Sequence, residues 1–220
     1  MGEPRVHPEL WRLEPLSREF GGDRGTSLDR YYIEGWLARN ASDVRGRVLE
    51  VGDNIYTRRF GGRAVATSDV VYLKPGKPGV TIVADLRDAP AIPSRAFDCV
   101  ILTQTLHLID DIKAALATVH RVLKPGGVCL ASLPGISQIS SYDAARWGDH
   151  WRFTPHSARK LFEDAFTGGA VSVESMGNVL SACGFLQGIA THELTRDELD
   201  FNDADYPLVV AVRAARNTVA

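Results

Sequence analysis

The sequence predicts a single α/β domain built on a mostly parallel sheet. Short runs rich in β-branched residues alternate with helical segments, which is the pattern of a parallel sheet covered by helices. The chain has 220 residues, 45% hydrophobic and 24% charged, as expected of a globular protein with a sizeable core. Its formal net charge of −2 gives no basic excess, so we expect neither a nucleic-acid partner nor an anionic membrane surface.

Seven strands are predicted, each a short apolar run bounded by glycine, proline or a carboxylate. They cover residues 46–51, 63–68, 79–84, 97–103, 128–133, 171–175 and 208–213. Helices are expected at 27–41, 110–123, from 155 to about 165, and 178–193, with Thr154 as an N-cap and Pro155 at the first helical position. Residues 1–26, rich in glycine and proline, are expected to form an arm or lid ahead of a single domain over residues 27–220.

The cysteines, the first ten residues and the longest uncharged stretch indicate in which cellular compartment the protein resides. The three cysteines are odd in number and lack metal-ligand spacing, and Cys99 and Cys129 lie in apolar runs as core residues do. Residues 1–10 lack the apolar core of a signal peptide, and the longest uncharged stretch, 175–191, is too polar to span a bilayer. We therefore expect a cytoplasmic protein without a membrane span and without a required metal.

The residues that follow the predicted strands indicate where a ligand would bind. In an open parallel sheet, ligands lie beyond the carboxyl ends of the strands. The first strand continues into Gly52, which lets the backbone approach a ligand, and the second and third end on Asp69 and Asp85. Asp69 lies 17 residues past Gly52, near the spacing of about 20 at which a carboxylate accepts from two ribose hydroxyls. The alternative is that both carboxylates are solvated turn residues.

Five motifs in order resemble the class I S-adenosylmethionine-dependent methyltransferases. They are VLEVGDN at 48–54, SDV at 68–70, ADL at 84–86, FDCVILTQTLHLI at 97–109 and RVLKPGGVCLASLP at 121–134. Two further stretches, GTSLDRYYIEGWL at 25–37 and RWGDHWRFTPHSARKLFEDAF at 146–166, look like methyltransferases (type 11-like) found with glycosyltransferases in polysaccharide clusters. The resemblance implies a Rossmann-like seven-stranded sheet with helices on both faces and an antiparallel last strand.

The resemblance also implies roles for individual residues around S-adenosylmethionine. Glu50 and Gly52 would line the methionine end, together with the neighbouring Asp53 and Asn54. Asp69, followed by Val70, would accept from the ribose hydroxyls, Asp85 would accept from the adenine amino group, and Leu86 would pack on the adenine ring. Thr103 and Gln104 would close the site near the transferable methyl through their backbone carbonyls.

One motif departs from the family pattern. The glycine-rich loop usually reads acid-x-Gly-x-Gly-x-Gly, whereas here Asn54 and Tyr56 replace the second and third glycines. Asn tolerates a left-handed backbone, which would let Asn54 make the turn, while Tyr56 would hold the next helix farther from the ligand. Weaker cofactor binding, or a chain that does not catalyse, is the alternative that this departure keeps open.

Residues 29–32, Asp-Arg-Tyr-Tyr, have two interpretations. Folded over the site, Arg30 would pair with the cofactor carboxylate, and Tyr31 or Tyr32 would shield the sulfonium by a cation–π contact. In the other interpretation the segment is an amphipathic helix with Tyr32, Ile33 and Trp36 in the core.

The segment after the fifth predicted strand gathers aromatic and polar side chains where an acceptor would lie. Tyr142, Trp147 and Trp151 offer faces that stack on sugar rings, and Arg152 or Asp149 would fix hydroxyls. The alternative is that the aromatic residues fill the edge of the core, that Asp149 and Arg152 form an internal ion pair, or that the exposed aromatics serve a homodimer.

Methyl transfer to a hydroxyl needs a group that removes its proton, and histidine suits this near neutral pH. His150 in the aromatic segment and His107 after the fourth strand are the candidates, and each has an ordinary structural role as its alternative. We expect a methyltransferase that acts on oxygen in a small-molecule or saccharide acceptor, in polysaccharide or specialised-metabolite biosynthesis. The alternative is a non-catalytic module on the same fold, and the lack of G-x-G-x-x-G argues against a nicotinamide dehydrogenase.

Overall fold

The computed structural model describes residues 12–218 and contains a seven-stranded sheet of order β3-β2-β1-β4-β5-β7-β6. Only β7 runs antiparallel, to both β5 and β6, while the remaining neighbours pair in parallel. The strands are β1 Gly46–Val51, β2 Val65–Tyr72, β3 Ile82–Val83, β4 Phe97–Thr103, β5 Leu123–Pro134, β6 Ala170–Met176 and β7 Val209–Ala215. The predicted fold class is confirmed, including the antiparallel last strand.

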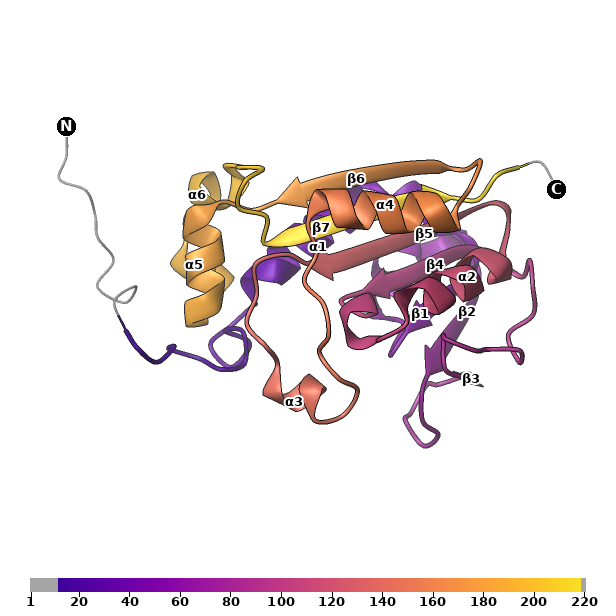
Figure 1. Ribbon diagram of the computed structural model, residues 1–220, viewed down its shortest axis with the longest axis horizontal. Coiled ribbons are helices and arrows are strands. Elements are labelled where there is room, and N and C mark those ends of the chain that lie inside the picture. Colours follow the sequence, from indigo (N-terminus) through magenta and orange to yellow (C-terminus); the bar gives the residue numbers. More distant parts are fainter. Residues whose placement is uncertain (1–11, 219–220) are drawn as a thin grey trace.

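Helices cover both faces of this sheet (Figure 1). They are α1 Leu28–Arg39, α2 Ile112–Val122, α3 Ser141–Ala144, α4 Pro155–Ala165, α5 Val179–Gln187 and α6 Arg196–Asp200. In Figure 1, α2 and α4 lie in front of the sheet and α1 lies behind it. Within the described residues, none of the helices is long and apolar enough to cross a bilayer.

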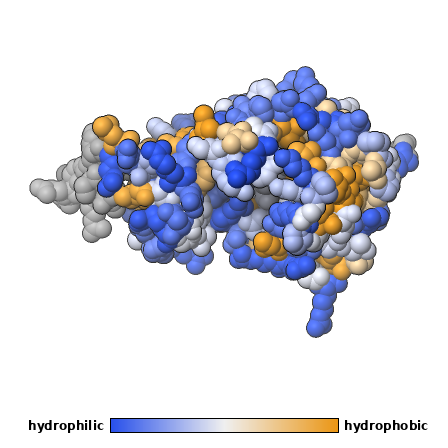
Figure 2. Space-filling model, turned by 90° about the horizontal axis from the view of Figure 1, so that it is seen from below, coloured by the Kyte–Doolittle hydropathy of each residue, from blue (hydrophilic) through white to orange (hydrophobic). Residues whose placement is uncertain are grey.

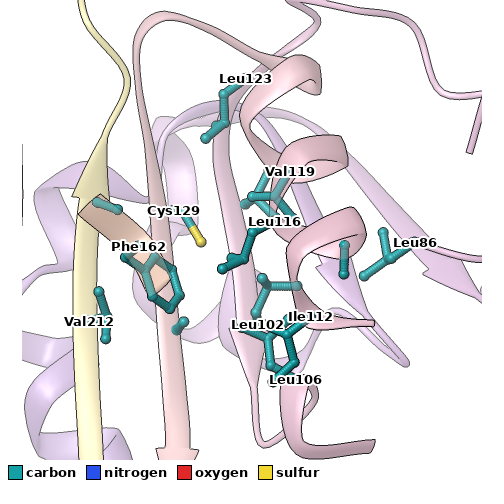
Figure 3. Close-up of a cluster of buried hydrophobic side chains, with 14 of the residues drawn as sticks. Leu86, Leu102, Leu106, Ile112, Leu116, Val119, Leu123, Cys129, Phe162 and Val212 are labelled. Carbon is teal, nitrogen blue, oxygen red and sulfur yellow. The ribbon is translucent and has the colours of Figure 1, made fainter. Parts of the chain in front are cut away.

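Two apolar cores result from the alternation of side chains along the central strands. Val100 and Leu102 of β4 face the core under α2 and α4, whereas Cys99 and Ile101 face the core under α1. Figure 3 shows the first of these cores, in which Leu116 and Val119 of α2 meet residues of the sheet and Phe162 of α4. Both faces of the sheet are therefore buried under helices, and ligands can approach only the edges of the sheet and the ends of its strands.

Several element boundaries differ from the sequence-based expectation. β2 runs to Tyr72 instead of ending at Ser68, because Val70 and Val71 are buried and continue the pairing with β1. β3 shrinks to two residues, and β5 begins at Leu123 instead of Val128. α5 ends at Gln187 instead of Glu193, because Gly188 adopts a left-handed backbone (φ +74°), at a position where a Cβ would clash with Ser17.

The helix start at residue 155 follows the prediction. The Thr154 side chain accepts from the Ser157 amide, the Ser157 hydroxyl bonds back to Thr154, and Pro155 occupies the first turn. Because this capping involves only neighbouring residues, 154–157, the sequence alone could predict where the helix begins.

The described part of the expected arm, residues 12–26, packs against α5. The Leu16 amide donates to the Gln187 carbonyl (2.8 Å), and the rings of Phe20 and Phe185 lie 5.3 Å apart. Residues 1–11 of the expected arm lie outside the described residues. The lower side of the molecule, where α3 lies in Figure 1, is shown in Figure 2: hydrophobic residues there gather in separate patches among hydrophilic ones.

Candidate functional site

A cleft of about 590 Å³ opens at the carboxyl ends of β1, β2 and β4 and around the short β3. We call it the β2–β3 cleft. Its polar and aromatic lining includes Tyr72, Lys77, Asp85, Arg87, Gln104, Tyr142, Trp147 and His150. Gly52 also lines it with φ +89°, so the backbone of the loop after β1 reaches the ligand space without a side chain.

A second cavity, of about 700 Å³, lies on the other side of the β1 and β4 ends. We call it the arm cavity, because residues 19–27 form one of its walls, with α1, the loop after β1, the loop after β4 and α3. The two cavities share Val51, Thr103, Gln104 and Leu108. A ligand in the β2–β3 cleft can therefore meet a second ligand in the arm cavity at these residues.

Gln104 occupies this shared position in a strained conformation. Its φ of +45° lies in the left-handed region, which non-glycine residues rarely adopt, and its amide donates to the Ser132 carbonyl (2.9 Å) and hydroxyl (3.2 Å). Such strain costs about 1–3 kcal/mol and clusters at ligand-binding positions. The structure places Thr103 and Gln104 on the wall shared by the two cavities, and their expected role beside the transferable methyl stays a prediction.

Glu50 at the end of β1 stabilises the loop that follows it. Its buried carboxylate accepts from the amides of Tyr56 (3.2 Å) and Thr57 (2.8 Å) and from the Thr57 hydroxyl (2.7 Å). Burial raises the pKa of Glu50 above its usual value, against these hydrogen bonds, which favour the charged form. Glu50 still lines the arm cavity, with Asp53, whose side chain accepts from the Ile55 amide (3.0 Å).

The altered glycine loop turns in a different way from the one expected. Asn54 does not adopt a left-handed backbone; its side chain donates to Ser68 Oγ (3.0 Å) instead. Tyr56 is buried against Phe60, and its hydroxyl accepts from Arg30 Nη1 (3.1 Å). The bulk that replaces the third glycine therefore fixes Arg30 at the arm cavity.

The expectation that Asp69 ends the second strand is wrong. Asp69 lies three residues before the end of β2, where it accepts from Arg47 Nε (2.7 Å) and Thr81 Oγ1 (3.0 Å), and neither it nor Val70 lines the β2–β3 cleft or the arm cavity. The strand end is occupied by Tyr72, with Lys77 Nζ 4.8 Å from its ring centroid. The apolar run Val70–Val71 after Asp69 was the signal that could have revealed this.

Asp85 and Leu86 do line the β2–β3 cleft. Asp85 forms an ion pair with Arg87 (2.6 Å), and Arg87 also binds Asp110 (2.8 Å). The hydrogen bonds from Arg87 lower the pKa of Asp85, so this carboxylate is ionised over the whole neutral range. Leu86 is buried beside it and offers an apolar wall.

The two candidate cofactor-binding residues on α1, Arg30 and Tyr31, lie in different surroundings. Arg30 lines the arm cavity. Tyr31 points away from both cavities, because its hydroxyl donates to Asp200 Oδ1 (2.5 Å) in α6. Tyr32 is buried in the core and donates to the Leu199 carbonyl, as the amphipathic-helix interpretation required. The expectation that Tyr31 shields a cofactor is thus not supported by its position.

The aromatic segment after β5 separates in the same way. Tyr142 and Trp147 line the β2–β3 cleft, with Trp147 6.0 Å from Tyr142 and 6.3 Å from Tyr72 between ring centroids. Trp151 lines neither cavity and donates through Nε1 to the Ile109 carbonyl (3.0 Å).

Arg152 forms the internal ion pair that the sequence offered as the alternative to a substrate contact. It forms a bidentate ion pair with Asp149 (2.5 and 3.0 Å) and donates to the carbonyls of Ser137 and Gln138. Burial acts to raise the pKa of Asp149, but the hydrogen bonds from Arg152 and the Ser140 amide outweigh it and leave that pKa lowered. This pair shapes the loop, so the substrate role expected for Arg152 is not supported by its position.

The two candidate histidines face different cavities. His107 is 8% exposed and lines the arm cavity, whereas the exposed His150 lines the β2–β3 cleft and packs on Gly148. Burial lowers the pKa of His107 to about 4, so the ring is neutral at pH 7. Of the two candidate histidines, only His107 lines the arm cavity, and its ring is neutral there at pH 7.

Part of the chain is similar in sequence to known proteins. The methyltransferase domain family matches residues 62–131. The arginine-hydroxylase NDUFAF5, mitochondrial, of Rattus norvegicus is 30% identical over 129 residues, which is 57% of this chain. This chain spans about a third of the length of that curated relative (33%).

Solved structures support the fold. A SAM-dependent methyltransferase from Archaeoglobus fulgidus superposes with a TM-score of 0.57 at 15% identity, covering 85% of this chain and 94% of its own. An S-adenosylmethionine-dependent methyltransferase from Mesorhizobium loti gives the same TM-score at 18% identity, with 84% and 98% covered. At these identities the likeness establishes a shared fold.

Proposed function

We propose that this chain is a class I S-adenosylmethionine-dependent methyltransferase, and that it transfers a methyl group from a cofactor in one cavity to an acceptor in the other. The observation that carries the proposal is that the β2–β3 cleft and the arm cavity meet at Thr103 and Gln104. A cofactor on one side and an acceptor on the other would then react across the strained Gln104.

The residues of the β2–β3 cleft fit the cofactor. Leu86 offers an apolar wall for the adenine ring, and the ionised Asp85 is an acceptor for its amino group. Tyr72 and Lys77 stand at the end of β2, so the ribose hydroxyls would meet these groups and not Asp69. Arg30, held by Tyr56, would pair with the cofactor carboxylate from the arm-cavity side.

The arm cavity would hold the acceptor. S-adenosylmethionine supplies an electrophilic methyl group on a sulfonium. An acceptor hydroxyl in the arm cavity would receive this methyl group, the sulfonium would leave as a neutral thioether, and His107, whose ring is neutral at pH 7, would accept the hydroxyl proton. We retain the expected small-molecule or saccharide hydroxyl as the acceptor. Tyr142 and Trp147, which were expected to stack on it, line the β2–β3 cleft and not the arm cavity.

The three free cysteines, two of them buried, support a reducing compartment such as the cytoplasm. A homodimer remains a prediction. A non-catalytic module is the second candidate, because Asn54 and Tyr56 alter the cofactor loop and Glu50 is engaged by loop amides.

Calorimetric titration with S-adenosylhomocysteine and S-adenosylmethionine tests the proposal. We expect micromolar binding of both. Asp85→Asn should weaken it about tenfold, about 1.4 kcal/mol, through loss of the charged acceptor. Asp164→Asn, which removes the same charge from the exposed face of α4, serves as the control. Absence of binding at millimolar ligand would favour the non-catalytic module, and equal affinity in Asp85→Asn would remove Asp85 from the site.

A further inference from the structure

Carboxylates from four separate segments converge on the arm cavity. Its wall contains six of them and a single guanidinium, that of Arg30. The carboxylates are Glu19 of the arm, Asp29 and Glu34 of α1, Glu50 near the end of β1, Asp53 in the loop after β1, and Asp143 of α3. A cavity with this balance attracts cations and repels anions.

Some of these charges are already engaged. Glu34 pairs with Arg59 (2.7 Å), Asp29 lies 3.9 Å from Arg30, and Glu50 binds loop amides. Glu19 and Asp143 form no ion pair with any residue between 12 and 218. The segments that carry them are joined by a hydrogen bond from Gln138 Nε2 to the Arg18 carbonyl (3.0 Å). Asp53 has no ion pair either, but its side chain accepts from the Ile55 amide. Glu19 and Asp143 are therefore the two wall carboxylates that have neither an ion pair nor a side-chain hydrogen bond within residues 12–218.

An independent observation points to a ligand in the same cavity. His107 is more than nine-tenths buried, and its Nδ1 has no hydrogen-bond partner among the described residues. The buried Ser27 Oγ, which belongs to another wall of the cavity, also lacks one. An unpartnered buried polar atom costs about 1–3 kcal/mol, so native proteins keep few of them. A polar ligand in the arm cavity would lie beside both residues.

The cofactor accounts for only part of this negative charge. Its amino group and sulfonium, bound across Gln104, would face Glu50 and Asp53 on the β1 side. Glu19 and Asp143 belong to the arm and to α3, which are the acceptor's walls in the proposed function. The volume of about 700 Å³ suits a small molecule.

We infer that the acceptor is a small molecule that carries a protonated amine, recognised by Glu19 and Asp143, with a separate hydroxyl as the nucleophile. An amino sugar or a hydroxylated amine meets this description. The inference rests on the proposed function for the transfer step, but the charge preference of the cavity is measurable without transfer. A neutral N-acetylated analogue would leave both carboxylates unpaired and lose this attraction.

Ligand-observed NMR titration of the full chain, with and without S-adenosylhomocysteine, tests the inference. The probes are glucosamine, ethanolamine and 1,4-diaminobutane, each paired with its fully N-acetylated, uncharged form. We expect at least one amine to bind about tenfold more tightly than its N-acetylated partner. Glu19→Gln and Asp143→Asn should each reduce this preference about threefold or more, and the double variant should abolish it.

Glu163→Gln, an equal change of charge on α4, is the matched control and should leave the preference unchanged. Calorimetry should show that the variants at 19 and 143 bind S-adenosylhomocysteine within twofold of the parent chain. If none of the three amines binds more tightly than its N-acetylated form, or if the variants keep the preference, the inference is overturned. Amine preference without any cofactor binding would instead overturn the proposed function and leave the cation site standing.

Discussion

The two cavities at the sheet end differ in chemistry although they share one boundary. The β2–β3 cleft is walled by aromatic and aliphatic groups, with Tyr72, Trp147 and Leu86 among them, and its carboxylate Asp85 is paired with Arg87. The arm cavity is walled by carboxylates, of which Glu19 and Asp143 have no ion pair within the described part of the chain. One edge of a parallel sheet can thus offer a surface for a flat nucleoside and a surface for a cation, with the strained Gln104 among the four residues that line both.

The largest effect is expected from acidification, and it belongs to the arm cavity. The pKa of His107 is about 4 in the folded chain, against an ordinary value of about 6.5. Between these pH values the unfolded chain binds a proton that the folded chain refuses, so the free energy of unfolding falls as pH drops from 6.5 to 4. The loss should reach about 3 kcal/mol, measured by urea unfolding at several pH values.

His107→Gln removes the titrating group and should flatten that part of the pH dependence, while the remaining carboxylates still titrate at lower pH. If the parent chain and His107→Gln lose stability in parallel from pH 6.5 to 4, His107 is not the group responsible.

Gly52→Val should weaken ligand binding in the β2–β3 cleft and leave ligand binding in the arm cavity unchanged. A β-branched side chain is strained at φ +89° and would enter the β2–β3 cleft. We expect affinity for S-adenosylhomocysteine to fall about 100-fold, about 2.7 kcal/mol, in calorimetry. Amine binding in the arm cavity without cofactor should stay within twofold, and a loss of both together would mean that the cavities are not independent.

Asp69→Asn should affect stability and not the cofactor. It removes the charge that binds Arg47 and Thr81 inside the sheet, and hydrogen bonds to charged groups are worth about 1.5–3 kcal/mol. Thermal and urea unfolding should show a loss of about 2 kcal/mol, with S-adenosylhomocysteine affinity within twofold of the parent. Unchanged stability together with a loss of affinity for S-adenosylhomocysteine would instead mean that Asp69 binds the ribose.

The features that depend on local sequence were predictable. The strands at 46–51 and 97–103 and the capped start of α4 follow from apolar runs and capping residues within a few positions. Thr103 and Gln104 reach the site because they follow a strand whose end the sequence marks clearly.

The features that depend on packing were not predictable. The end of β2 is decided by Val70 and Val71 becoming buried and by Arg47 and Thr81 satisfying Asp69, and these partners lie 22 and 12 residues from it. Arg152 offered an ion pair and a substrate contact equally well in the sequence, because both roles need the same charged groups. The acidity of the arm cavity comes from four segments that only the tertiary structure brings together.

A crystal structure of the full chain with S-adenosylhomocysteine would test the two-cavity account most directly. The account predicts the adenine between Leu86 and Asp85 in the β2–β3 cleft, the sulfur beside Gln104, and the arm cavity open to the sulfur. An adenine seated in the arm cavity, or a ribose bound to Asp69, would contradict it.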